Sequence, residues 1–219
     1  MSHPLRVVVL ISGRGSNLAA ILNAIDCGDC AAQVVGIVSD RAKAHGLALG
    51  EPHGIPTTVV RPKDHPDRDA WDRALADAIG AYDPELIVLA GFMRIVGAPI
   101  IDRFAPRIIN VHPSLLPAFR GAHGAADAID AGVRLSGCTV HIVDSGLDSG
   151  PIIAQAAVRV LPGDTPDALQ TRIQGAEHRL LPLVIDAIAR KRVLLGPPLA
   201  ITAEDDDGAW LFSSPFAQS

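Results

Sequence analysis

The chain has 219 residues, of which 48% are hydrophobic and 20% are charged, and it carries a net charge of −5. This length fits one domain with a small appendage, and the composition excludes a largely disordered chain. The acidic balance argues against a protein that coats nucleic acid, which needs a basic face, so an anionic ligand would have to be held by specific donors.

Up to about residue 112 the sequence alternates between strand and helix patterns. Short β-branched runs predict strands at residues 6–12, 34–39, 57–60, 86–90 and 107–111. Apolar residues at helical spacing predict helices between them, at residues 17–26, 41–49, 67–81 and 99–104. This alternation is typical of a mostly parallel sheet with helices on both faces. Ligands bind such sheets at the carboxyl ends of strands, so the informative loops follow Ile11, Ala90 and Val111.

The pattern changes after residue 112. A helix is predicted at residues 122–131, strands at 138–143 and 152–160, and a long helix at 165–190. Thr165 is a typical capping residue, and Pro182 predicts a kink or interruption of the long helix. We expect a single α/β domain of Rossmann-like type over residues 1–192 and a C-terminal extension over residues 193–219, a hairpin or partly mobile tail.

The sequence predicts neither a signal peptide nor a membrane span. The first apolar run is strand-sized, and no apolar stretch approaches the ~20 residues that cross a bilayer. Cys27 and Cys30 have no second ligand pair at the spacing of a zinc site, and three cysteines do not form a disulfide framework. A redox motif is the alternative for this C-x-x-C pair, although the pair falls late in a predicted helix and not at a helix start. We expect a cytoplasmic protein with reduced thiols and no metal.

A glycine-rich loop from Ser12 to Asn17 follows the first predicted strand and opens a helix. Gly15 permits close approach of the backbone to a ligand, and a helix N-terminus offers N–H groups to phosphate. Ser16 and Asn17 can cap the helix or donate to the anion. The loop lacks the third glycine of the dinucleotide fingerprint and the lysine of a Walker motif. It fits a phosphate site, with a glycine turn and ordinary helix cap as the alternative.

Asn110 and His112 stand two residues apart at a strand end, so their side chains face the same side of the sheet. An amide donor beside an imidazole suits a reaction at a carbonyl group. The amide can stabilise an oxyanion, and the imidazole can donate a hydrogen bond or move a proton. A hydrogen-bonded pair in the core is the alternative interpretation.

A glycine-rich acidic loop at residues 143–151 carries Asp144 and Asp148. A carboxylate near a histidine orients the ring and favours its charged form. The loop lacks the alternating acids and final glutamate of a calcium-binding EF-hand. A turn closed by an aspartate is the alternative, and it fits Asp144 better than Asp148.

Four motifs occur in the order and spacing of the folate-dependent formyltransferases. They are VLISGRGSNL near the start, AGFMRI at residues 90–95, NVHPSLLP at 110–117 and GCTVHIVDSGLDSGP at 137–151. The chain resembles this family over roughly residues 5–192, most closely the members that act on glycinamide ribonucleotide in purine biosynthesis. The resemblance implies transfer of a formyl group from 10-formyltetrahydrofolate to the amine of that ribonucleotide, by direct attack through a tetrahedral intermediate and without a metal.

The resemblance also implies roles for individual residues. The expected catalytic residues are Asn110, His112 and Asp148. The expected phosphate loop is Gly15, Ser16 and Asn17, and the Q-x-x-E-H motif near the end implies that Gln174 holds the phosphate end and Glu177 the ribose. The expected folate pocket comprises Leu89, Met93, Arg94, Ile95, Val96, Val143 and Asp144.

The chain departs from the family at several positions. Arg120 stands where many members have proline, which puts the shape of that loop in doubt. His123 is a possible site residue in a variable segment. Arg14 occupies a variable position of the phosphate loop and could strengthen an anion contact.

Other functions stay open at this point. Within the family, the alternatives are formyltetrahydrofolate hydrolase, methionyl-tRNA formyltransferase and nucleotide-sugar formyltransferase. We expect no regulatory domain before Arg6 and no tRNA-binding domain after Arg192, which disfavours the first two. A nucleotide-binding module without catalysis is the alternative from another class. The expected partners are small-molecule substrates, with no nucleic acid or membrane, and the chain could be a monomer or a homodimer.

Overall fold

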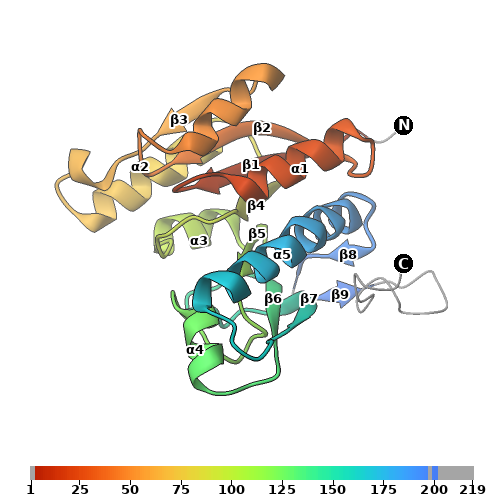
Figure 1. Cartoon of the computed structure of the whole chain (residues 1–219). Helices are drawn as coiled ribbons and strands as arrows, with labels where there is room; N and C mark the ends of the chain where they lie inside the picture. The colour runs from red at the N-terminus through yellow and green to blue at the C-terminus, as the bar shows by residue number, and fades with distance from the viewer. Residues whose placement is uncertain (1–2, 197–198, 202–219) are drawn as a thin grey trace.

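The computed structural model describes residues 3–196 and 199–201, and its main sheet confirms the predicted α/β class. This sheet has seven strands in the order β3-β2-β1-β4-β5-β6-β7 (Figure 1). The strands are β1 (Leu5–Ile11), β2 (Ala32–Ser39), β3 (Thr57–Val59), β4 (Leu86–Leu89), β5 (Ile108–His112), β6 (Leu135–Ile142) and β7 (Ile152–Arg159). All pairs up to β4–β5 are parallel, whereas β5–β6 and β6–β7 are antiparallel.

The α-helices match the predicted segments closely. They are α1 (Ser16–Asp26), α2 (Arg68–Gly80), α3 (Ala98–Phe104), α4 (Gly124–Asp130) and α5 (Pro166–Ala189). Thr165 caps α5 as predicted, because its side chain accepts a hydrogen bond from the backbone N–H of Ala168 at 3.2 Å. None of the helices in the part of the chain that the structure describes is long and apolar enough to cross a membrane.

Two helix predictions were wrong in part. Of the segment predicted as a helix at residues 41–49, residues 41–44 are non-helical, and the rest belongs to a 3-10 helix, η1 (His45–His53), which contains Gly46, Gly50 and Pro52. Glycine and proline disfavour a regular α-helix. Pro182 does not interrupt α5, which runs through it as a helix of 24 residues. Pro182 itself is buried together with Leu181 and Val184, so tertiary packing outweighs the lost backbone hydrogen bond.

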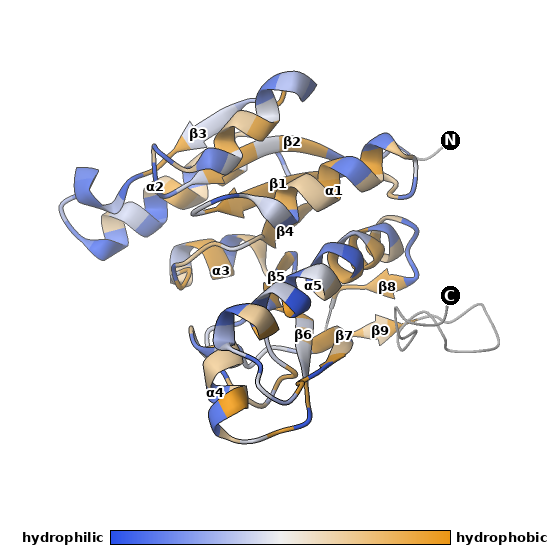
Figure 2. Cartoon of the chain, viewed as in Figure 1, coloured by the Kyte–Doolittle hydropathy of each residue, from blue (hydrophilic) through white to orange (hydrophobic). Residues whose placement is uncertain are grey.

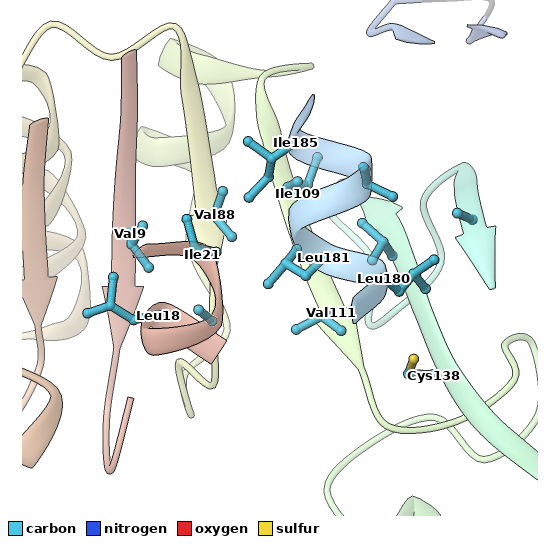
Figure 3. Packing of buried hydrophobic residues seen from close by; sticks show 14 of the residues in the cluster. Val9, Leu18, Ile21, Val88, Ile109, Val111, Cys138, Leu180, Leu181 and Ile185 are labelled. Carbon is cyan, nitrogen blue, oxygen red and sulfur yellow. The ribbon is translucent and has the colours of Figure 1, made fainter. Parts of the chain in front are cut away.

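The sheet divides the core into two layers, and successive side chains of β1 point alternately into one layer and the other. Val7, Val9 and Ile11 face a cluster with α1 and α5, whereas Val8 and Leu10 face a cluster with α2 and α3. Figure 2 shows the corresponding hydrophobic colouring of the central strands. Figure 3 shows side chains of α1 near β1 and β4, and side chains of α5 near β5. This two-sided burial explains why the parallel strands are continuous apolar runs.

The chain after α5 forms a small antiparallel pair. β8 (Val193–Leu194) pairs with β9 (Ala200–Ile201), so the part of the extension that the structure describes contains a strand pair. Residues 197–198 and 202–219 of the predicted extension lie outside the described residues. The division of the chain at residue 192 therefore stays a prediction.

Replacing Leu181 of α5 with alanine should lower the free energy of unfolding by about 2–5 kcal/mol, because it removes a fully buried side chain and leaves a cavity. Urea unfolding measures this change. The matched control is Leu183→Ala on the same helix, where the leucine is 52% exposed and its loss should cost little. Equal losses in the two variants would contradict the packing described here.

Candidate functional site

A cavity of about 400 Å³ lies at the carboxyl ends of β4 and β5. Asn110, His112 and Asp148 all line it, although they come from β5 and from the loop between β6 and β7. The structure also places the whole predicted folate set in its wall: Leu89, Met93, Arg94, Ile95, Val96, Val143 and Asp144. The cavity has the size of a small-molecule site.

His112 is buried and lies between two oxygen acceptors. Its Nδ1 is 3.4 Å from Oδ2 of Asp148, and its Nε2 donates to the backbone carbonyl of Phe119 at 3.0 Å. The backbone N–H of Gly121 donates to the same Asp148 oxygen at 3.1 Å. The turn that carries Phe119 and Gly121 therefore contacts both members of the histidine–aspartate pair.

Asp148 has a φ of 48°, in the left-handed region that non-glycine residues rarely adopt. Its side chain is only 12% exposed and lies within 4 Å of two histidines, His112 and His141. Such backbone conformations are retained where the surrounding structure requires them, and they cluster at functional sites. The strained backbone supports a role for Asp148 that goes beyond closing a turn.

Asn110 is held by a residue that the sequence reasoning missed, His141. The Asn110 amide nitrogen Nδ2 lies 3.2 Å from Nε2 of His141, and Nδ1 of His141 lies 2.9 Å from the backbone carbonyl of Ile142. A carbonyl only accepts, so Nδ1 carries the proton and Nε2 accepts from the Asn110 amide. Burial lowers the pKa of His141 and keeps the ring neutral, which this arrangement requires. The sequence signals for His141 were its place within the predicted strand at residues 138–143 and within the family motif at residues 137–151.

The loop after β4 forms one wall of the cavity and is fixed at several points. Ser12 accepts a hydrogen bond from the backbone N–H of Met93 at 2.9 Å. Arg94 donates to Asp40, whose side chain is fully buried, at 2.7 Å, and its guanidinium lies 5.7 Å from the ring centre of Trp71. These contacts hold the apolar wall in place before any ligand arrives.

The helix α2 fixes the far end of the same loop. Asp72 accepts from the backbone N–H of Gly97 at 3.3 Å, and Arg68 donates to the backbone carbonyl of Ile95. Arg68 and Asp72 also form an ion pair with each other at 2.7 Å. Neither residue has a place in the cavity, so both act on the loop from behind.

A second pocket of about 210 Å³ adjoins the first, because Gly91, Met93, Val111 and Pro113 line both. It is lined by all five residues predicted to bind the ribonucleotide: Gly15, Ser16, Asn17, Gln174 and Glu177. The ordinary helix cap considered as an alternative is absent, since Gly15 occupies the N-cap of α1 and no side chain caps it. The first N–H groups of α1 are thus available to an anion.

Asn17 and Glu177 meet at the floor of the second pocket. Both are nine-tenths buried or more, and Nδ2 of Asn17 donates to Oε2 of Glu177 at 2.9 Å. Burial raises the pKa of Glu177, while the hydrogen bond from Asn17 and the charge of His112 oppose that rise. Oδ1 of Asn17 is buried without a hydrogen-bond partner, so it can accept from a hydroxyl or amine of a ligand.

Three further residues singled out in the sequence are Asp144, Arg120 and His123. Asp144 accepts from the backbone N–H of Gly146 at 3.0 Å and from Ser149 at 2.8 Å, so it closes its own turn while lining the cavity. Arg120 and His123 are exposed, and neither lines the cavity. His123 occupies the N-cap of α4 without capping it through its side chain.

Known proteins share this architecture. A family model described as formyl transferase matches residues 5–185. The chain belongs to the formyl transferase family. It is 48% identical over 188 residues to the phosphoribosylglycinamide formyltransferase of Mycobacterium tuberculosis (strain H37Rv), with 86% of each chain covered.

Solved structures agree with the family assignment. The glycinamide ribonucleotide transformylase 1 of Symbiobacterium toebii has a TM-score of 0.89 and 44% identity, over 93% of this chain and 96% of that chain. A formyltetrahydrofolate deformylase from Pseudomonas syringae is also similar, at a TM-score of 0.82 and 29% identity, over 89% of this chain and 64% of that chain. The formyl transferase fold therefore accommodates more than one reaction of a formyl group.

Replacing His141 of this formyl transferase with phenylalanine should lower kcat by about 10- to 100-fold, because the Asn110 amide loses the acceptor that orients it. His141→Gln keeps an acceptor and should recover part of the loss. Steady-state kinetics of both variants measure the effect, and KM should change little. Unchanged kcat in His141→Phe would show that the hydrogen bond does not orient the amide.

Acid should destabilise the protein partly through His141. Its folded-state pKa lies below the ordinary 6.5, so the unfolded chain binds this proton more readily. The stability that the neutral ring confers is complete above about pH 6.5 and is lost as the pH falls below that value. We expect His141→Gln to lose less unfolding free energy than wild type between about pH 7 and about pH 5 in urea titrations. Parallel pH dependences would contradict this expectation.

Proposed function

We propose that the chain transfers the formyl group of 10-formyltetrahydrofolate to the amine of glycinamide ribonucleotide, a step of purine biosynthesis, in the cytoplasm. The observation that carries this proposal is the position of Asn110, His112 and Asp148 in the larger of two adjoining pockets. One pocket suits an apolar ring system and the other an anion, so a reaction between two bound molecules can take place where they join. The comparisons with known members of the family support the same acceptor.

The larger cavity fits a folate. Its wall combines buried apolar side chains such as Leu89 and Val96 with the exposed side chains of Met93, Ile95 and Leu147 at its rim. Flat heteroaromatic rings bind in such apolar clefts and are oriented by a few polar groups. Asp144 and Asp148 are polar groups of this cavity, and the fixed loop after β4 shapes it.

The smaller pocket fits a ribonucleotide. The uncapped N-terminus of α1 provides N–H groups for the phosphate, and Gln174 provides an amide nearby. Glu177, held by Asn17, provides a carboxylate for ribose hydroxyls. With the ribose phosphate in this pocket, the glycinamide amine extends toward Val111 and Pro113, which line both pockets.

The mechanism follows from what each group can donate. The Asn110 amide has a second N–H that His141 does not engage, and we assign it to the formyl oxygen as negative charge develops there. His112 is assigned to the same oxygen through Nε2. In the structure that N–H donates to Phe119, so the loop that carries Phe119 would have to release it. Asp148 is assigned to stabilise the charged His112 ring and to help order a water that relays the proton from the attacking amine to the departing folate nitrogen.

The nearest alternative is hydrolysis, in which water replaces the amine. The same Asn110, His112 and Asp148 could serve either acceptor, and a deformylase has a similar fold. The pocket at the N-terminus of α1 favours transfer, because hydrolysis has no use for a second substrate site. No group of three or more residues able to hold a metal ion occurs among the described residues.

Consumption of 10-formyltetrahydrofolate, followed by absorbance, should depend strictly on glycinamide ribonucleotide. Asn110→Ala and His112→Ala should each lower kcat by about 100- to 1,000-fold, because each removes a donor to the developing charge. His65→Ala is the control, since His65 follows a 3-10 helix and lines neither pocket. It should keep wild-type activity.

The outcomes of this assay separate the alternatives. Consumption without an acceptor would establish hydrolysis and end the transferase proposal. No consumption under either condition would direct the search to nucleotide-sugar acceptors and then to a binding module without catalysis. Near-wild-type turnover in both active-site variants would refute the roles assigned to Asn110 and His112.

A further inference from the structure

Arg14 is the one cationic side chain among the described residues that line the second pocket. The pocket also contains a carboxylate, that of Glu177, which is 5% exposed. A phosphate in this pocket is therefore repelled by Glu177 whenever Glu177 is ionised. The whole chain, at −5, does not supply a compensating field.

Arg14 stands on a rigid turn. Gly15 has a φ of 78°, and a Cβ at that position would lie 2.7 Å from the Cα of Gly46. The backbone N–H of Gly46 also donates to the carbonyl of Gly13 at 3.0 Å. The residues on both sides of Arg14 are thus fixed against η1, so its Cα is held at the mouth of the pocket.

The Arg14 guanidinium forms no ion pair with a carboxylate within the part of the chain that the structure describes. Other arginines near the site are already engaged: Arg94 pairs with Asp40, and Arg68 pairs with Asp72. An arginine that is exposed, unpaired and placed in a pocket can bind a phosphate without first breaking an ion pair.

The floor of the pocket gives an independent sign of a ligand. Oδ1 of Asn17 is buried and lacks a hydrogen-bond partner, although Nδ2 of the same side chain is satisfied by Glu177. A buried acceptor of this kind is costly unless a ligand donates to it. Asn17 at the floor and Arg14 at the mouth thus provide an acceptor and a cation in one pocket.

We propose that Arg14 binds the phosphate of the acceptor and gives the enzyme its preference for a phosphorylated substrate. This inference rests on the proposed function, because it assigns the phosphate of the ribonucleotide to the second pocket. Arg14 adds a charged, bidentate donor to the backbone N–H groups of α1, and it offsets the repulsion by Glu177.

The test compares Arg14→Gln, Arg14→Lys and wild type. Arg14→Gln should raise KM for glycinamide ribonucleotide by about tenfold or more, with kcat and KM for the folate nearly unchanged. The preference for the ribonucleotide over its dephosphorylated nucleoside should fall by the same factor, and Arg14→Lys should recover part of it. Lys63→Gln makes the same change of net charge outside both pockets and should have no effect.

A second measurement needs no turnover. Inorganic phosphate should raise Tm of the wild type and of Lys63→Gln, and it should raise Tm of Arg14→Gln much less. If wild type shows no ribonucleotide-dependent turnover but phosphate protection requires Arg14, the proposed function fails while the anion site stands. If KM, substrate preference and phosphate protection in Arg14→Gln all equal those of the wild type, the proposal about Arg14 is wrong.

Discussion

The antiparallel pairing of β5 with β6 is the constraint on which the candidate site depends. It sets His141 directly opposite Asn110, and the sheet changes from parallel to antiparallel at this pair of strands. In an antiparallel pair, opposite residues share a face and lie close together. The loop after β6 then returns Asp148 to the same end of the sheet, where it meets His112. A shift of one residue in this register would turn His141 away and leave the amide unsupported.

Much of this arrangement could be predicted from the sequence, because it depends on local patterns. The period-two spacing places Asn110 and His112 on one face of the sheet. The glycine-rich loop that follows β1 and opens α1 predicts an anion site from its sequence alone. The contacts that hold these elements in place could not be predicted. Asp40 and Arg94 are separated by 54 residues, and the register of β6 depends on the whole sheet. A single sequence carries no signal for such pairs.

In the segment of η1, by contrast, a local pattern was present but gave a wrong prediction, because tertiary contacts outweigh it. Its apolar residues resemble those of a helix, yet Gly46 packs against Gly15 and Gly50 against the backbone of Ile55. A Cβ at either glycine would lie under 3 Å from a neighbouring atom, so close packing against neighbouring segments determines the backbone conformation of this stretch. The prediction of an α-helix considered only the period, whereas the close approach to the glycine-rich loop before α1 determines the conformation.

The two pockets are also linked by charge. Burial raises the pKa of Glu177, and His112 lies close enough to that carboxyl to oppose part of the rise, while its Nδ1 lies 3.4 Å from Asp148. Because such an interaction is reciprocal, a hydroxyl that donates to Glu177 would alter the charge that His112 experiences. A ligand in the second pocket would thus change the electrostatic environment of His112, one of the two groups assigned to the formyl oxygen.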